Sequence, residues 1–450
     1  MTCGPRMKSA FSRREVVALV ALLIFALLIR LWNLGSFPDT LNPDEADTLQ
    51  DSLRILYGAP PIRGFFGFDW KPQPAFSIYL LAGFLRVFGE SIAVTRLPSA
   101  LFSTIALVPF WWLVRRQVGG LAAWCATFLL STSVWYLHFS RSGWENVHVA
   151  LWMLMGMVCL VKLLDSHFKA RWWLAGTIVF CTLGLYGYFG GRAIWLATLV
   201  YFFGLAIKSA FPRRQALSSA ALVFVGALLL FTPQIISITQ DFISFNERTS
   251  TVLIFNSPEW KSDPVGTASQ QIVHNVTGFW RGSPNNRARY LPIGLPSLDR
   301  ISGLFLAAGM LVSVLRHRYR SRFETGLWWT MLLVSWGLTQ LLSTNTPDPA
   351  RGVGWMPTLY FFVALGLDIL IRRSRSKTHL ACYIIPSLVV LIGLANVRLY
   401  VDWQSDSKVR EARQPYIRPD EFEKWKSEVI VRSTNRMPTL NAGDWRRFHE

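Results

Sequence analysis

Charged side chains are scarce in this chain of 450 residues: only 16% are Asp, Glu, Lys or Arg, whereas 52% are hydrophobic. So small a charged share excludes a disordered chain and an ordinary soluble protein, and it indicates a protein that crosses a membrane several times. The net charge of +19 comes from basic residues grouped between apolar segments. Because membrane topology explains that grouping better than a basic binding face does, we expect no nucleic-acid partner.

Cysteine pairs and nucleotide-binding loops are missing as well. Of the five cysteines, all but Cys3 lie within apolar runs and no two are spaced as CxxC, which argues against a disulfide framework or a thiolate zinc site. The chain has no internal repeat of fixed period and no GxxxxGK[ST] phosphate-binding loop. Without that loop, the letters DEAD at residues 44–47 are a coincidence and not a helicase motif.

Apolar runs of membrane-spanning length are what the chain has in abundance. They lie at residues 15–34, 96–114, 120–138, 146–164, 172–187, 192–208, 217–239, 299–315, 325–343, 353–371 and 379–397. The first follows a basic N-terminus as a signal peptide would, but it has no small-residue cleavage site, so we expect it to be retained. These runs predict an all-α polytopic membrane protein with about 11 to 13 transmembrane helices.

Basic runs fall on every second connection between these spans. They are Arg13-Arg14, Arg115-Arg116, Lys169 with Arg171, Arg213-Arg214, residues 316–322 and residues 372–377. The positive-inside rule places them in the cytoplasm, so we expect a multi-pass protein of the cell membrane with its N-terminus inside and its C-terminus outside. Residues 1–397 would form the transmembrane domain, with outer connections at 35–95 and 241–298, and residues 398–450 an extracytoplasmic tail.

The first outer connection holds two predicted helices. Residues 74–89 are apolar but short, and a crossing there would put every later basic run outside, so we expect a helix at the outer interface or partly re-entrant. A second helix is expected at 43–56, with Asn42 as its N-cap. That places Asp44 and Glu45 in its first turn, where the helix dipole favours anions. They either only cap this helix or supply a general base with a carboxylate partner.

A second acidic position, Glu145, lies in the next outer turn, flanked by His138, Arg141 and His148. An acid among basic and polar side chains beside a membrane helix suggests a polar site, and a solvated turn is the alternative interpretation. A metal site formed by His138, Glu145 and His148 would have a spacing that fits no established ligand pattern.

Candidate phosphate ligands lie on the same predicted face. Lys71 precedes the interfacial helix and offers a point charge, although alone it is an ordinary surface lysine. The turn at 186–192 brings Tyr188 and two glycines next to Arg192, whose guanidinium either clamps a phosphate or snorkels. Arg351 adds another guanidinium on that side.

Acids and cations thus gather on one membrane face, while the centres of the spans carry no charge. A transporter more often has ionisable groups near mid-membrane. We therefore expect an enzyme acting at the membrane surface on a lipid-linked, phosphate-bearing substrate. A transporter or flippase of lipid-linked saccharides is the alternative, and a catalytically inactive scaffold of the same fold is a third interpretation.

The order of these motifs resembles the GT-C membrane glycosyltransferases, specifically the bacterial relatives of protein O-mannosyltransferases and of lipid A aminoarabinose transferases. The resemblance rests on Asp44-Glu45, Lys71-Pro72, residues 88–91, residues 95–100, the Tyr186-to-Arg192 turn and residues 281–299. It is good over about 15–210 and thinner over 275–360. Gln73 stands where the family usually has a second proline, and the tail matches nothing.

That resemblance implies a GT-C fold and a polyprenyl-phosphate sugar donor whose anomeric carbon is inverted as the lipid phosphate leaves. It leaves the sugar open, and the acceptor open among lipid, glycan and protein. Some enzymes of this kind need a divalent metal and others do not. Since the sequence contains no clear ligand set, neither a metal nor another cofactor is assigned.

The resemblance also implies roles for individual residues. Asp44 matches the family's catalytic acid of the first outer loop, Glu45 its acidic neighbour, and Glu145 a second acid that is often Asp. The expected substrate-binding residues are Lys71, His138, Arg141, Tyr188, Arg192 and Arg351. Of these, Lys71, Arg192 and Arg351 would hold the phosphate.

Overall fold

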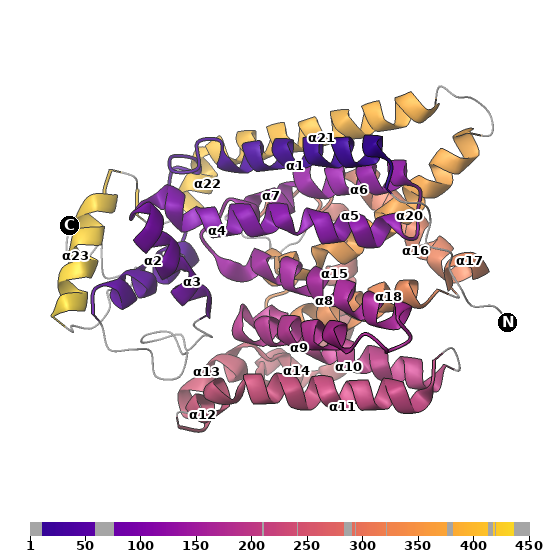
Figure 1. The fold of residues 1–450 in the computed structure, drawn as a ribbon. Helices are drawn as coiled ribbons and strands as arrows, with labels where there is room; N and C mark the ends of the chain where they lie inside the picture. The colour runs from indigo at the N-terminus through magenta and orange to yellow at the C-terminus, as the bar shows by residue number, and fades with distance from the viewer. Residues whose placement is uncertain are drawn as a thin grey trace.

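In a computed structural model, the chain is a bundle of helices lying side by side (Figure 1). The structure describes residues 11–58, 76–208, 211–240, 242–282, 290–292, 294–320, 322–375, 381–412, 417–418 and 420–435. Over these ranges the only β-type pairing is an isolated bridge between Leu253 and Ser343. The prediction of an all-α fold is confirmed.

Every run predicted as a span lies on one or two helices. These are α1 (Arg13–Leu31), α4 (Ile92–Ile105), α5 (Leu107–Arg115), α6 (Gly120–Thr132), α7 (Val134–Ser140), α8 (His148–Asp165), α9 (Arg171–Tyr186), α10 (Arg192–Ile207), α11 (Arg213–Leu230), α12 (Thr232–Gln240), α16 (Arg300–Leu315), α18 (Phe323–Trp336), α20 (Met356–Arg375) and α21 (Ala381–Ser405). Within the described residues, 6 helices are long and apolar enough to cross a membrane, or 7 if the bent pair α6–α7 is one span. The protein is thus a multi-pass membrane protein, and the count of eleven crossings stays a prediction.

The run predicted as a single span at 120–138 is broken in the structure. The axes of α6 and α7 differ by 60°, and between them Ser133 is extended, with φ −55° and ψ 131°. The hydroxyls of Ser131 and Thr132 both donate to the Phe128 carbonyl, at 2.8 and 2.9 Å. Hydroxyl side chains that bond to the preceding turn compete with the helix's own hydrogen bonds and often bend it.

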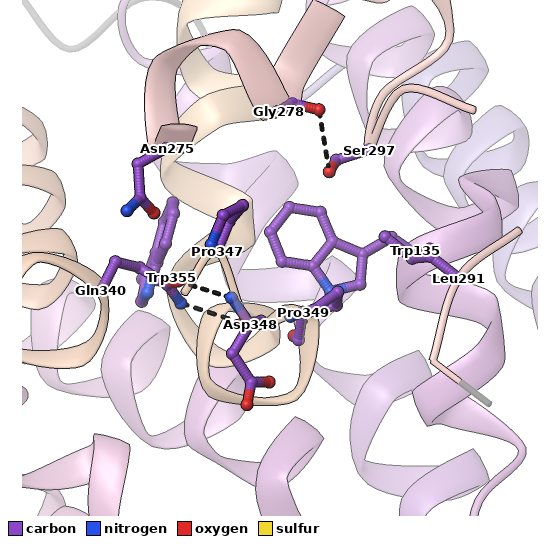
Figure 2. A pocket seen from close by; sticks show the side chains of 10 residues that line it. All are labelled: Trp135, Asn275, Gly278, Leu291, Ser297, Gln340, Pro347, Asp348, Pro349 and Trp355. Carbon is purple, nitrogen blue, oxygen red and sulfur yellow. Dashed lines mark hydrogen bonds between the residues drawn. The ribbon is translucent and has the colours of Figure 1, made fainter. Parts of the chain in front are cut away.

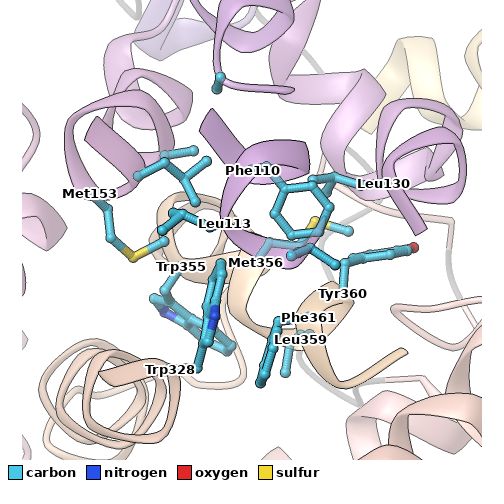
Figure 3. Packing of buried hydrophobic residues seen from close by; sticks show 14 of the residues in the cluster. Phe110, Leu113, Leu130, Met153, Trp328, Trp355, Met356, Leu359, Tyr360 and Phe361 are labelled. Atoms are coloured by element: carbon cyan, nitrogen blue, oxygen red, sulfur yellow. The ribbon is translucent and has the colours of Figure 1, made fainter. Parts of the chain in front are cut away.

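Close helix contacts in the middle of the bundle depend on glycine. A Cβ on Gly309 of α16 would overlap the Phe362 carbonyl of α20, and one on Gly366 of α20 would overlap the Phe305 carbonyl of α16. Small residues let membrane helices approach to backbone contact in this way. Around this crossing the core is aromatic and aliphatic (Figure 3), with the rings of Trp328 and Phe361 stacked 4.7 Å apart.

Three shorter helices gather at the end of the bundle predicted to be the outer one. They are α2 (Pro43–Leu56), α3 (Phe76–Phe88) and α23 (Phe422–Thr434) (Figure 1). The helix predicted at 43–56 is confirmed at both bounds, and so is its N-cap, Asn42. The helix α3 packs on α2 and α4, and its position at the membrane interface stays a prediction.

The outer connection 241–298 was expected to be a loop, but much of it is helical. It contains α13 (Phe242–Val252), α14 (Pro258–Ser262) and α15 (Pro264–Arg281). The physical reason is local. Ser257 and Asp263 each accept a hydrogen bond from a backbone N–H of the first turn, and each is followed by a proline at the first helical position, which is a strong start signal.

The predicted tail is also structured and docks on α2. The helix α21 runs through the expected boundary at residue 397 to Ser405 and is followed by α22 (Ser407–Ala412). The Leu41 N–H donates to the Ile417 carbonyl at 3.1 Å. Phe422, Trp425 and Val429 of α23 are buried in one cluster with Leu49 and Leu53 of α2. The tail thus covers the back of the helix that carries Asp44.

The opposite end of the bundle is held by ion pairs. They join Arg115 to Glu15 at 2.6 Å, Arg116 to Asp165 at 2.8 Å and to Glu324 at 3.3 Å, and Arg372 to Asp368 at 2.7 Å. Here lie the start of α1, the ends of α5, α8 and α20, and the short α17 (His317–Arg320) (Figure 1).

Candidate functional site

The start of α2 fixes the position of Asp44. The Asn42 side-chain oxygen accepts the Glu45 N–H at 3.1 Å, and the Glu45 carboxylate accepts the Asn42 N–H at 2.9 Å. This reciprocal capping box satisfies two of the free backbone donors at the helix end. Between these two residues of the box, Asp44 is half-buried, and the Tyr290 hydroxyl donates to its Oδ2 at 3.2 Å.

Glu45 points away from Asp44 and into the protein. Its Oε1 receives the Arg96 Nε–H at 3.0 Å and the Gly143 N–H at 2.6 Å. With the Asn42 N–H on Oε2, both carboxylate oxygens have donors, and the residue is only 3% exposed. The geometry suits an anchor for α2, and the predicted catalytic role of Glu45 stays a prediction.

Arg96 is a site residue that the sequence did not single out. Besides Glu45, its guanidinium donates to the carbonyls of Leu34, Pro38 and Thr40 at 2.9–3.0 Å. It therefore ties the segment before α2 to α4. The sequence shows Arg96 as a lone arginine at the start of an apolar run. Such a residue usually has a structural or functional partner.

Gly143 lets the turn that carries Glu145 approach α4 and α2. A Cβ at this position would overlap the side chain of Thr95, so a larger residue would push the turn away from Glu45. Asn42 adds a second link, since its amide donates to the Ser142 hydroxyl at 3.3 Å. These contacts bring Glu145 next to the first turn of α2.

Glu145 faces Asp44 from this turn. It is 6% exposed, and its charge and that of Asp44 are close enough to repel each other. Its Oε2 has no hydrogen-bond partner among the described residues. Burying a polar group without a partner is costly, so an arrangement of this kind marks a candidate functional site.

Aromatic rings form one wall of the site. Trp144 lies between two tyrosines, with its ring 6.0 Å from that of Tyr290 and 5.5 Å, edge-on, from that of Tyr188. Burial raises the pKa of Tyr188 above its usual value, and so does the carboxylate of Asp348. The charges of Asp44 and Glu145 act in the same direction. Tyr188 therefore keeps its proton and can donate a hydrogen bond to a ligand.

Arg351 brings a positive charge to the same place. It lies in α19 (Pro349–Gly352), pairs with Asp348 at 3.4 Å and donates to the Thr344 carbonyl at 2.8 Å. The Asp348 N–H in turn donates to the side-chain oxygen of Gln340. Both residues line a pocket together with two tryptophans (Figure 2). The structure thus brings together four of the predicted residues: Asp44, Glu145, Tyr188 and Arg351.

Arg141 is not part of this group. Its guanidinium donates to the carbonyls of Ile29, Arg30, Trp32 and Phe37 at 2.6–2.8 Å, and the residue is 1% exposed. The carbonyls of Ile29 and Arg30 are orphan acceptors in the last turn of α1, and those of Trp32 and Phe37 belong to the segment that follows it. The contacts of Arg141 are thus structural, and its predicted role in substrate binding stays a prediction.

The remaining predicted ligands lie elsewhere. The His138 ring is 5.0 Å from that of Trp403, and its Nδ1 is 3.4 Å from the Gln404 amide, so it packs on α21. The Arg192 guanidinium lies over the Phe189 ring, 4.5 Å from its centroid. Among the described residues, no ion pair joins Arg192 to a carboxylate. Lys71 lies outside the described residues.

No metal ligand set can be named from this geometry. Across the described ranges, no group of three His, Cys, Asp or Glu side chains is placed to hold a metal ion. The chemistry that the site itself offers is proton acceptance by a carboxylate, hydrogen bonding by tyrosine and pairing of an anion with arginine.

Comparison with known proteins agrees with the resemblance found in the sequence. Residues 72–236 match the family described as dolichyl-phosphate-mannose-protein mannosyltransferase. No curated protein sequence matches the chain. Among solved structures, the Archaeoglobus fulgidus oligosaccharyltransferase in its apo form is 15% identical with a TM-score of 0.57, over 96% of this chain and 62% of that one.

A second similar structure is ArnT from Cupriavidus metallidurans bound to undecaprenyl phosphate. It is 15% identical with a TM-score of 0.56, over 94% of this chain and 70% of that one. The same protein in the apo state is 14% identical with a TM-score of 0.54, over 93% of this chain and 77% of that one. At these identities the likeness shows the fold, and the predicted GT-C fold is confirmed.

Proposed function

We propose that this chain, a member of the GT-C superfamily of membrane glycosyltransferases, transfers a sugar from a polyprenyl-phosphate donor to an acceptor. The observation that carries the proposal is the meeting of Asp44 and Glu145 with Tyr188 and Arg351 at one end of an apolar helix bundle. A similar fold in a protein bound to undecaprenyl phosphate supports a lipid phosphate as the leaving group. The acceptor is a hydroxyl or amine of a lipid, a glycan or a protein.

In the proposed reaction Asp44 is the general base. The acceptor's O–H or N–H gives its proton to the Asp44 carboxylate as its lone pair bonds to the anomeric carbon. The bond from that carbon to the phosphate oxygen breaks on the opposite face and its electron pair leaves with the lipid phosphate, so the configuration is inverted. The hydrogen bond from Tyr290 holds the Asp44 carboxylate in place during this step.

Cations near the carboxylates would stabilise the departing phosphate. Arg351 is already beside Tyr188. Arg192 follows Tyr188 by four residues, at the start of α10, and forms no ion pair with a described acid. Guanidinium groups bind phosphate through charge-assisted, bidentate hydrogen bonds. Because basic runs mark the other end of the bundle as cytoplasmic, the site is extracytoplasmic in this proposal.

The test is transfer from radiolabelled polyprenyl-phosphate sugars by the purified protein in lipid. The rate of sugar transfer by Asp44→Asn should be about 10²–10⁴-fold lower than that of the wild type, because the amide cannot accept the proton. Asparagine still suits a helix start, so the variant should unfold at the wild-type temperature and still bind donor.

Asp402→Asn is the matched control, since this exposed acid on α21 pairs with the exposed Arg398 at 3.6 Å. It should transfer sugar at the wild-type rate. Near-normal turnover by Asp44→Asn would remove the general base from the proposal and leave the acidic stretch as a helix cap.

A further inference from the structure

The amphipathic helix α15 turns its apolar face away from the protein. Apolar residues recur at helical spacing along one side of this helix, and all of those that follow are exposed: Val265, Ile272, Val273, Val276 and Trp280. Val265 is 77% exposed and Val276 is 47% exposed. A surface helix of a globular protein turns such a stripe towards the core. In α15 the orientation is reversed, so the stripe needs an apolar partner outside the protein.

The polar face of α15 is the one that contacts the protein. The Gln271 Nε2 donates to the Ser343 carbonyl and the Asn275 Nδ2 donates to the Thr346 hydroxyl, both at 3.2 Å. The Thr346 hydroxyl in turn donates to the Gln271 side-chain oxygen. Asn275 is buried by these contacts. A network of side-chain amides and a hydroxyl therefore holds the helix in its reversed orientation.

Gly278 allows the same face to come close to the connection before α20. A Cβ at this position would lie only 3.0 Å from the Pro347 side chain, and the Gly278 carbonyl accepts a hydrogen bond from the Ser297 hydroxyl at 3.4 Å (Figure 2). Four residues after Pro347 the chain reaches Arg351. The polar face of α15 thus supports the connection that carries this arginine.

The exposed face of α15 is continuous with the exposed side of α16. The Trp280 ring packs against Gly303, where a Cβ would overlap it. On either side of that glycine, Ile301 and Leu304 are 40% and 65% exposed. Because α16 lies on a run predicted to span the membrane, we expect these side chains to face lipid. Tryptophan is enriched where a membrane meets water, which agrees with the place of Trp280 between the two helices.

We propose that α15 is an interfacial helix whose apolar face binds the acyl chains of the leaflet nearest to Asp44. An exposed apolar face of this kind marks an interaction site, and bilayer lipid is the apolar phase that already surrounds the neighbouring α16. Amphipathic helices at an interface lie with the apolar face about 5–10 Å into the boundary between head groups and acyl chains. The inference goes beyond the proposed function, because it makes part of the connection 241–298 a lipid-binding element whichever group the protein transfers.

The experiment places the polarity-sensitive fluorophore NBD on single cysteines of the full chain, with its native cysteines replaced by serine. The protein is reconstituted in phosphatidylcholine vesicles with or without nitroxide-bearing lipids. On Val276→Cys the emission should shift to shorter wavelength, and nitroxides near the head groups should quench it more strongly than nitroxides at the ends of the acyl chains, because the label should lie only about 5–10 Å deep.

Two exposed positions serve as matched controls. Leu304→Cys on α16 is the lipid-facing control and should be quenched at least as strongly as Val276→Cys. Glu423→Cys on α23 is the water-facing control, since the Glu423 side chain is 73% exposed, and its label should be quenched least. Each labelled protein should unfold at the wild-type temperature, which checks that the fold is kept.

Two results would overturn the proposal. Quenching at Val276→Cys no stronger than at Glu423→Cys would place the face of α15 in water. A short-wavelength emission that lipid nitroxides do not quench would mean that protein, such as a second copy of this chain, covers the face instead of lipid. Either result leaves the proposed sugar transfer as it stands, because the measurement does not depend on activity.

Discussion

The two ends of the helix bundle use carboxylates in opposite ways. At the end where α1 begins, Glu15, Asp165 and Glu324 each pair with an arginine. At the other end, Glu145 is buried as well, yet one of its oxygens has no described partner. Paired acids hold helices together, whereas an unsatisfied one is maintained at a cost. The difference agrees with the proposal that the end carrying Glu145 does the chemistry.

The same contrast separates two neighbours in sequence. Glu45 is locked by Arg96 and two backbone N–H groups, whereas Asp44, one residue earlier, is half-buried at the site. A single helical step directs the first carboxylate towards Tyr290 and the second towards Arg96. An acidic pair at a helix start can therefore divide the work, with one residue for anchoring and one for reaction.

The contrast between the two ends of the bundle requires that they lie on opposite sides of the membrane. With the native cysteines replaced by serine, an impermeant maleimide should label Ser257→Cys and Ser405→Cys in sealed cells. Ser12→Cys, at the start of α1, should react only after permeabilisation, because the basic runs place that end inside. Labelling of all three in sealed cells would reject the predicted topology.

The largest loss of stability should follow removal of the arginine that anchors α2. Arg96→Ala leaves Glu45 buried without its partner, so the free energy of unfolding should fall by about 3–5 kcal/mol, and sugar transfer should fall with it as α2 loses its anchor. Thermal unfolding in detergent and the transfer assay measure the two effects.

A second substitution tests the cause of that loss. Adding Glu45→Gln to Arg96→Ala removes the uncompensated charge and should restore part of the stability. At the opposite end, Arg116→Ala breaks partly exposed pairs and should cost only about 1 kcal/mol. Equal losses for Arg96→Ala and Arg116→Ala would contradict the contrast between the two ends.

Glu145→Gln and Glu15→Gln form a matched pair. The first neutralises a carboxylate with an unsatisfied oxygen, so transfer should fall by about 10²-fold while stability is unchanged or increased. The second weakens an ion pair with Arg115, so stability should fall by up to about 1 kcal/mol and transfer should not change. If Glu145→Gln destabilises the protein and remains active, Glu145 is structural after all.

The smallest expected effect concerns the donor phosphate. Arg192→Ala should raise the KM for the lipid-phosphate donor by about tenfold, with little change in acceptor use, because a charge-assisted hydrogen bond to phosphate is lost. Lysine at this position should recover part of the loss. Unchanged donor kinetics would leave Arg192 as a residue that packs on Phe189 and snorkels.

Features with local causes could be predicted from the sequence. The start of α2 depends on Asn42, Pro43 and Glu45, which lie within four positions of each other, and the structure agrees with the prediction. The apolar spans likewise depend on composition over one segment. The helices of 241–298 were missed although Ser257-Pro258 and Asp263-Pro264 were local start signals, because the polar composition of that stretch was given more weight.

Contacts between distant segments could not be predicted. Nothing near Arg141 in the sequence shows that its guanidinium ends at the carbonyls of α1, about a hundred residues earlier. The pairing of Glu45 with Arg96 and the packing of His138 on α21 depend in the same way on how the helices pack. Residue type and predicted face therefore named four residues that the structure brings together and others that it places apart from them.

The docking of α23 on α2 has a consequence for biosynthesis. The helix that carries Asp44 emerges among the first segments of the chain, but the cluster around Leu49 and Leu53 is completed only when Phe422, Trp425 and Val429 arrive at the end. Until then the part of this apolar face that α23 covers stays open, and contacts between such distant parts of a chain form slowly. A ribosome that stops early therefore releases a chain in which α2 rests on α3 but lacks the cover of α23.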